Sequence, residues 1–312
     1  MPTKPNEDII PDYRGNPELL GILSHYASLI DETVNFGSQV FTWIFATVNK
    51  GDHHIAALSF FRRSIELLDS ISVLIKNSCI SPSRVLLRSL FEVLLSLEYM
   101  LQKDLENRGR DYILCLKYKE IDYLKKFVSS DPLHVEYVNK YKNDELLRNP
   151  VIPEIPNVME SIKAKKKLVK SEFYSSSEAS YQAIKRAKKG RNPKWWFNLH
   201  DGPKDIFDLA EKMSRPAQYE VMYRNWAGYA HGTGGMDEQV EIIGKGQIAI
   251  PQLRSPKDAE FVAFIAISYG LTILRIMIHE YAKEKLKDFG VWYKKEIQAG
   301  YLDMREERII VK

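Results

Sequence analysis

The chain has 312 residues, of which 45% are apolar and 28% are charged. This balance is typical of a soluble globular protein that is long enough to bury a core. Only two cysteines occur, Cys79 and Cys115, which excludes a disulfide framework and any multi-cysteine metal site and fits a reducing cytosol. The first twenty residues do not resemble a secretory signal, and no run of 18 apolar residues indicates a membrane span. We therefore expect a cytoplasmic protein that does not contact a membrane.

The net charge of +4 is unevenly distributed along the chain. Eleven basic and only two acidic residues lie between Lys163 and Lys194. A strongly basic segment on a mildly acidic body indicates contact with a polyanion such as RNA. A solvated lysine-rich loop without any partner is the alternative interpretation. The residues that we assign to nucleic-acid binding here are Lys165, Lys166, Lys167, Lys188 and Lys189.

Helical periodicity dominates the first 130 residues. Apolar residues that recur at three and four positions predict helices over residues 17–50, 53–77 and 106–129. Another helix is predicted to end near Gln102, with Ser81 as its N-cap and Pro82 at its first helical position.

The segment 131–203 is polar and rich in proline, and it holds the basic residues. We interpret it as an insertion with short helices, pinned to the body by Trp195, Trp196 and Phe197. Short helices near 204–213 and 218–231, a β-hairpin over about 239–251 and a long apolar helix over 256–285 follow. The predicted fold is a single all-α domain over 1–312, an up-and-down bundle whose core covers about 16–130 and 204–290.

The predicted helix that ends near Gln102 carries the first candidate site. Apolar residues surround its whole circumference, which indicates a buried helix. Arg84, Arg88 and Glu92 nevertheless follow one another at steps of four, so they form one polar stripe. Charged groups in such a setting must be paired or line a cavity. An Arg88–Glu92 ion pair within the helix is the simpler alternative to a binding pocket.

The second candidate site lies between Tyr223 and Gly235. In a regular helix, Arg224 and His231 are two turns apart, so both would project from one face. Arginine grips phosphate oxygens and histidine is the usual general acid or base near neutral pH, so the pair could act on one phosphate. The glycine-rich residues after His231 would admit a ligand. A histidine that merely packs at a helix end is the alternative. We expect this pair and the Arg88–Glu92 stripe to face one cavity.

This Arg224, Asn225, His231 pattern resembles the signature of the HEPN superfamily, the higher eukaryote and prokaryote nucleotide-binding proteins. In that signature, four to six residues separate an arginine from a histidine, and the first of them is usually polar. Here six residues intervene and Asn225 is the first. The resemblance implies metal-independent RNA cleavage by a homodimer. His231 would act as general acid or base, Arg224 would clamp the phosphate and Asn225 would orient the site.

A second resemblance covers more of the chain, from about Phe60 to Ile278 without the insertion. Arg84, Arg88 and Glu92, followed by Tyr99 and then by a distant Tyr223 and His231, look like an uncharacterised bacterial family of helical proteins, the domain-of-unknown-function family 5677. That resemblance implies no particular activity.

We therefore expect a HEPN-like endoribonuclease without cofactor or metal, acting on RNA as a toxin or anti-phage effector. Its expected partners are a second copy of the chain and an antitoxin or another component of a defence system. The alternative is a non-catalytic helical protein that binds a nucleotide or nucleic acid and regulates a partner. In that case the stripe of Arg84, Arg88 and Glu92 would form the ligand pocket, and His231 would be a hydrogen-bonding wall of it.

Overall fold

The structure is a computed structural model that describes residues 3–47, 51–142, 144–146, 155–231, 241–243, 247–250 and 252–304. It is all-α apart from two strands of three residues each within the described part. The chain divides into two compact units. Unit 1 comprises Met1–Lys50, Ala57–Lys103 and Ile206–Lys312, and unit 2 comprises Gly51–Ala56 and Asp104–Asp205.

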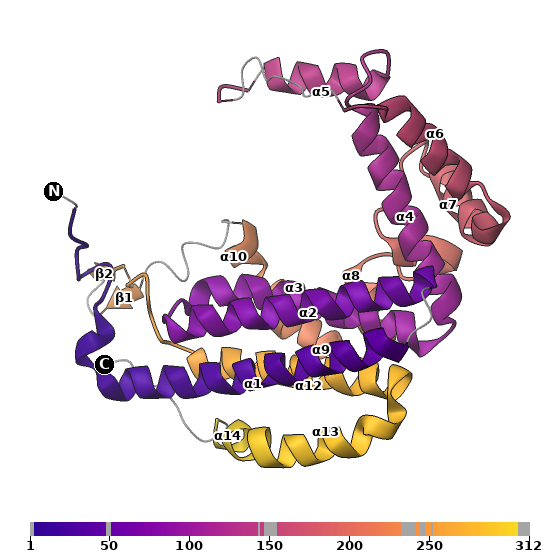
Figure 1. Ribbon diagram of the computed structural model, residues 1–312. Coiled ribbons are helices and arrows are strands. Elements are labelled where there is room, and N and C mark those ends of the chain that lie inside the picture. The colour runs from indigo at the N-terminus through magenta and orange to yellow at the C-terminus, as the bar shows by residue number, and fades with distance from the viewer. Residues whose placement is uncertain are drawn as a thin grey trace. The chain divides into compact units, whose positions relative to one another are not determined.

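Unit 1 is a helical bundle. Its long helices are α1 (Pro17–Thr47), α2 (Asp52–Lys76), α3 (Ile80–Gln102) and α12 (Ala259–Tyr281). The start of α2, up to Ala56, is counted with unit 2. Helix α12 packs along both α1 and α3, and Figure 1 shows the four helices running lengthwise beside one another. Their apolar stripes meet in a core of fully buried side chains that includes Ile30, Ile71, Leu87, Leu90 and Met277. Each such side chain contributes roughly 1.5–3 kcal/mol on burial.

Helix α12 is the most apolar element. By length and composition it could cross a membrane, because an 18-residue window has a mean hydropathy of 2.1. However, 61% of that window is buried inside the protein, where the helix contacts α1 and α3. A long apolar helix that is mostly covered by its neighbours in this way serves as a core helix of the bundle.

Shorter elements complete unit 1. They are η1 (Tyr13–Gly15), α8 (Ile206–Lys212), α9 (Pro216–Gln218), η4 (Tyr219–Arg224), α10 (Ala227–His231), β1 (Glu241–Ile243), β2 (Gln247–Ala249), η5 (Lys283–Lys285), α13 (Leu286–Trp292), η6 (Tyr293–Ile297) and α14 (Gln298–Asp303). Strands β1 and β2 pair antiparallel with Ile242 opposite Ile248. They lie within the predicted hairpin, whose turn residues 244–246 are outside the described part.

The elements after α12 include helices that the sequence patterns did not predict. One of their attachments to α1 is Trp292, whose ring stacks on Phe36 with centroids 4.0 Å apart. The indole Nε1 of Trp292 also donates a hydrogen bond of 2.7 Å to Glu32 Oε1. One aromatic residue thus supplies both an apolar surface and a polar attachment.

Unit 2 is built around α4 (Leu105–Lys125). The other elements are α5 (Pro132–Lys142), α6 (Val158–Val169), η2 (Glu172–Tyr174), α7 (Ser175–Ala187) and η3 (Trp196–Asp201). Helices α6 and α7 and η3 pack against α4, and the Tyr118 and Tyr181 rings stack with centroids 4.1 Å apart. Gly109 permits close approach of the chain at Gly51–Ala56, because a Cβ there would lie 2.5 Å from the His53 Cα.

This arrangement changes two boundaries that the sequence suggested. Helix α4 belongs with the insertion helices rather than with the bundle core of 16–130, because α6, α7 and η3 cover its buried face. Helix α3 begins at Ile80 with Cys79 as its N-cap, so Ser81 does not cap it and Pro82 is its third residue. The proline is tolerated there because the first-turn N–H groups have no acceptor within the helix.

Replacing Gly270 of α12 by alanine should lower the free energy of unfolding by about 1–3 kcal/mol. A Cβ at Gly270 would lie 2.8 Å from Thr33 Cγ2 and 3.1 Å from Leu68 Cδ1. Thr33 cannot easily move, because its hydroxyl donates to the Leu29 carbonyl at 2.9 Å and its χ1 is restricted. Urea denaturation followed by circular dichroism measures the change.

Gly21 of α1 provides the matched control, because a Cβ there would meet nothing within 4 Å. Gly21→Ala should therefore raise the free energy of unfolding by about 0.5–1 kcal/mol through helix propensity. A Gly270→Ala protein as stable as the Gly21→Ala protein would contradict the close approach of α1, α2 and α12.

Candidate functional site

The polar stripe of α3 faces the segment that contains the Arg224 motif. Arg84, Arg88 and Glu92 are half-buried, while Leu87, Leu90 and Phe91 between them are fully buried in the bundle. All three stripe residues lie in unit 1, as do α9, η4 and α10, so the structure describes their contacts directly.

Glu92 binds Tyr223 of η4. The Tyr223 hydroxyl donates a hydrogen bond of 2.8 Å to Glu92 Oε1. The Arg88 guanidinium lies 4.1 Å from the centroid of the same tyrosine ring, which is a cation–π contact. Burial raises the pKa of Tyr223 to about 12, so its hydroxyl stays protonated and remains a donor near neutral pH.

Arg84 ties two further elements together. Its Nη1 donates to the Tyr229 hydroxyl of α10, and its Nη2 pairs with Asp258 Oδ2 at 2.5 Å. Asp258 is the N-cap residue of α12. The Arg84 side chain is 14% exposed and the Asp258 side chain is 47% exposed, so solvent screens this ion pair less than a pair of two fully exposed groups.

A third attachment lies at the other end of α3. Arg215, which precedes α9, donates from Nε to Glu98 Oε2 at 2.7 Å and from Nη2 to Glu98 Oε1 at 2.5 Å. Both side chains are 17% exposed. Two parallel hydrogen bonds between charged groups fix orientation as well as distance. Helix α3 therefore holds the segment 215–229 at three points, through Glu98, Glu92 and Arg84.

The segment itself is not the single α-helix that the sequence predicted over 218–231. It consists of α9, the π-helix η4, a turn at Asn225 and Trp226, and α10. A π-helix carries more residues per turn than an α-helix and is frequent at functional sites. The expectation that Arg224 and His231 share one helical face assumed uninterrupted α-helix, and that assumption fails here.

Arg224 and Asn225 are exposed. The Arg224 Nη1 lies 3.0 Å from Glu220 Oε2, and the two side chains are 69% and 47% exposed. Arg224 is thus not in a cavity with Arg88 and Glu92, which is a correction to the sequence-based expectation. His231 ends α10, but its side chain lies outside the described residues, so its position relative to Arg224 stays a prediction.

The basic residues lie in unit 2. Lys166 and Lys167 of α6, and Lys188 and Lys189 after α7, are exposed. Lys165 differs from them, because its Nζ lies 2.5 Å from Glu120 Oε2 of α4. Lys165 therefore helps to attach α6 to α4, and the other four lysines are available to a polyanion.

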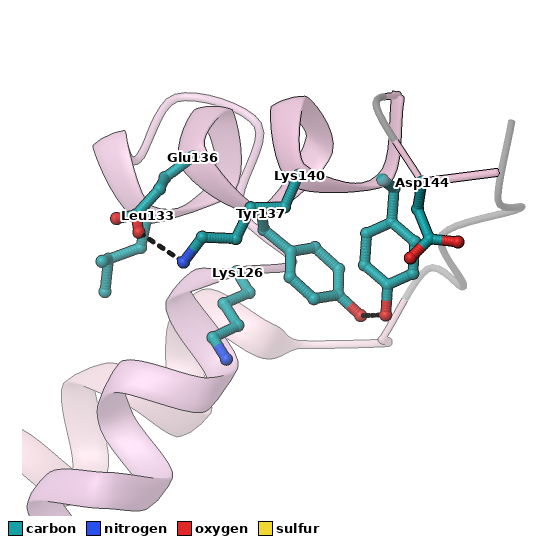
Figure 2. Close-up of a pocket in the computed structure, with 7 residues that line it drawn as sticks. Lys126, Leu133, Glu136, Tyr137, Lys140 and Asp144 are labelled. Carbon is teal, nitrogen blue, oxygen red and sulfur yellow. Dashed lines mark hydrogen bonds and ion pairs between the residues drawn. The ribbon is translucent and has the colours of Figure 1, made fainter. Parts of the chain in front are cut away.

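Helix α5 contributes an aromatic pocket in the same unit (Figure 2). The cavity measures about 360 Å³ and includes Lys126, Tyr137 and Tyr141. The two tyrosine hydroxyls lie 3.0 Å apart, and the Lys126 Nζ is 5.4 Å from the Tyr137 ring centroid. In proteins that bind single-stranded nucleic acid, bases stack on aromatic rings and neighbouring lysines neutralise the phosphates.

Sequence reasoning missed the partners of the stripe. Tyr223 stands out in the sequence only as part of the family resemblance, Tyr229 and Asp258 do not stand out at all, and only the folded path of the chain brings the three to Arg84 and Glu92. The sequence did carry one signal for these contacts, because charged residues on an otherwise apolar helix need polar or charged partners elsewhere in the fold. Among the described residues, no group of three His, Cys, Asp or Glu side chains is placed to hold a metal ion.

Tyr223→Phe should lower the free energy of unfolding by about 1–2 kcal/mol, because it leaves Glu92 without its donor. Tyr219→Phe is the matched control. Tyr219 lies one turn away with its ring stacked on Tyr223 at 5.1 Å, but its hydroxyl makes no hydrogen bond among the described residues, so stability should be unchanged. Equal losses in the two variants, measured by chemical denaturation, would show that the Glu92 hydrogen bond contributes nothing.

Comparison with known proteins agrees with one of the two resemblances. Residues 54–241 match the model of a family of unknown function, DUF5677. Searches against curated proteins and against solved structures find no significant match. The matched region contains the polar stripe, the whole of unit 2 beyond residue 53 and the Arg224 motif. Because it spans more than half of the sequence, the chain belongs to the DUF5677 family.

Proposed function

We propose that the chain is a metal-independent endoribonuclease of the HEPN type, with Arg224, Asn225 and His231 as its catalytic residues. One observation carries this proposal. Tyr223 and Tyr229, which lie on either side of Arg224 and Asn225, are bound to α3, while Arg224 and Asn225 between them are exposed. The segment is thus fixed from the inside and presents its polar residues outward, where a polymer can reach them.

In the proposed reaction, the His231 imidazole takes the proton of a ribose 2′-hydroxyl, whose oxygen attacks the adjacent phosphorus. The bond from phosphorus to the 5′-oxygen breaks, a 2′,3′-cyclic phosphate is left on one fragment, and the 5′-oxygen of the other takes a proton from water while His231 returns its proton to the solvent. Arg224 neutralises the charge that develops on the phosphate oxygens, and Asn225 orients the site. The exposed Arg224–Glu220 pair is worth only about 0–1 kcal/mol, so a phosphate can replace Glu220 at little cost.

The surfaces of unit 2 support RNA as the substrate. The exposed lysines of α6 and of the residues after α7 supply sequence-independent attraction to phosphates, and the tyrosines of the α5 pocket offer faces for unpaired bases. We propose further that the protein is a cytoplasmic homodimer and acts as a toxin or anti-phage effector, controlled by an antitoxin or another defence component.

A non-catalytic RNA-binding regulator would use the same lysines and tyrosines and differ only at the motif. From the sequence alone, this alternative places a ligand pocket at Arg84, Arg88 and Glu92. The contacts of Arg84 and Glu92 with Tyr229 and Tyr223 favour an anchoring role for this stripe instead. Cleavage therefore separates the two functions.

Incubating the purified protein with total RNA in EDTA should yield cleavage, and His231→Ala should reduce the rate by about 10²–10⁴-fold. Arg224→Ala should be similarly impaired, because the two side chains act on the same phosphate. Arg62→Ala is the matched control, since Arg62 is also an exposed arginine paired with a glutamate four residues on. Full activity of a folded His231→Ala protein would exclude the nuclease and leave the regulator.

Replacing Lys166, Lys167, Lys188 and Lys189 together by glutamine should weaken RNA binding and flatten its salt dependence. A protein that makes fewer phosphate contacts releases fewer counterions when it binds RNA. The control replaces four exposed lysines of unit 1 with the same change of charge: Lys76, Lys283, Lys287 and Lys294. Fluorescence anisotropy across a salt series measures both proteins. The same salt slope in both variants would show that the four lysines of unit 2 are only solvated and do not contact RNA phosphates.

A further inference from the structure

A cavity of about 540 Å³ lies in unit 1, at the ends of α3, α8 and α12. This volume is within the range of small-molecule sites in proteins, about 300–1,000 Å³. Its lining includes apolar and basic side chains, together with the acidic Glu98 and Glu280. Leu101, Ile276 and Leu286 contribute apolar surface, and Lys212, Arg275 and His279 contribute basic groups.

The basic groups lack counterions. Arg275 and His279 are one turn apart on α12, so they project from the same side. Within the described part of the chain, neither makes a hydrogen bond or an ion pair. The Lys212 Nζ lies 5.2 Å from the Tyr99 ring centroid and has no carboxylate partner among the described residues.

The acidic groups of the lining do not cancel this charge. Glu98 already binds Arg215 through both of its oxygens, which leaves Glu280 as the acidic group that faces the cavity without such a partner. Basic residues near helix C-termini often only compensate the helix dipole. Arg275, however, lies six residues before the last residue of α12, beyond the turn where that effect acts.

We propose that this cavity binds an organic anion with an apolar body. A carboxylate or phosphate head would accept hydrogen bonds from Arg275, His279 and Lys212, and an aliphatic body would cover Leu101, Ile276 and Leu286. The site is separate from the RNA motif and goes beyond the proposed function. It does, however, share Glu98 with the attachment of Arg215 that begins the motif segment.

Isothermal titration calorimetry of the full chain tests the proposal with four probes. Octyl phosphate and octanoate carry both halves of the ligand and differ in the head group, so they distinguish a phosphate from a carboxylate site. Inorganic phosphate carries the anion alone, and octanol carries the apolar body alone. At least one amphiphile, kept below its micelle concentration, should bind at least tenfold more tightly than inorganic phosphate and than octanol.

The double variant Arg275→Gln, His279→Gln should weaken binding of that amphiphile at least tenfold, because it removes charge-assisted hydrogen bonds. Both side chains are exposed, so the variant should fold, which circular dichroism checks. Lys283→Gln changes a nearby exposed lysine outside the lining and should bind as the wild type does. Absence of amphiphile binding at millimolar concentration, equal binding of inorganic phosphate, or undiminished binding by the double variant would each overturn the proposal.

Discussion

The structure depends on one requirement, that charged side chains on a buried helix must find partners. Helix α3 is enclosed by the bundle, yet it carries Arg84, Glu92 and Glu98 on surfaces that water reaches only in part. An unpaired charge in such a place would cost several kcal/mol. The partners come from the segment 215–229 and from the N-cap of α12. The need to pair the charged side chains of α3 therefore determines the path of the segment that carries the Arg224 motif.

This anchoring explains how a short and irregular segment can present a defined site. A π-helix and a five-residue helix have little stability of their own. The three polar attachments to the core helix α3 supply the stability that hydrogen bonds within the segment do not. The attached residues point inward, and Arg224 and Asn225 remain exposed. Unit 2 supplies a different property, a surface of lysines and tyrosines whose helices are held together around α4. The proposed function assigns RNA cleavage to the anchored segment and RNA binding to the lysines and tyrosines of unit 2.

The sequence predicted the features that depend on periodicity. The long helices, the buried character of α3 and the exposed lysines follow from patterns of apolar and charged residues within one element. It did not predict features that depend on contacts between distant residues. The attachment of α4 to the insertion, the helices after α12 and the partners of Arg84 and Glu92 all arise from such contacts. The π-helix in the motif was also missed, because the seven-residue spacing of Arg224 and His231 was interpreted with the geometry of a regular α-helix.

Amide hydrogen exchange of residues 216–229, resolved by peptide mass spectrometry, tests the anchoring most directly. Exchange reports the free energy of local opening, and the attachments to α3 should slow it well below the rate of an unstructured peptide. In a double variant Arg84→Met, Glu92→Met, which removes the acceptor of the Tyr223 hydroxyl as well as the Arg84 donors, exchange of 216–229 should become at least tenfold faster while that of α1 stays unchanged. Fast exchange of this segment in the wild type, or exchange that the two substitutions leave unaltered, would contradict the account.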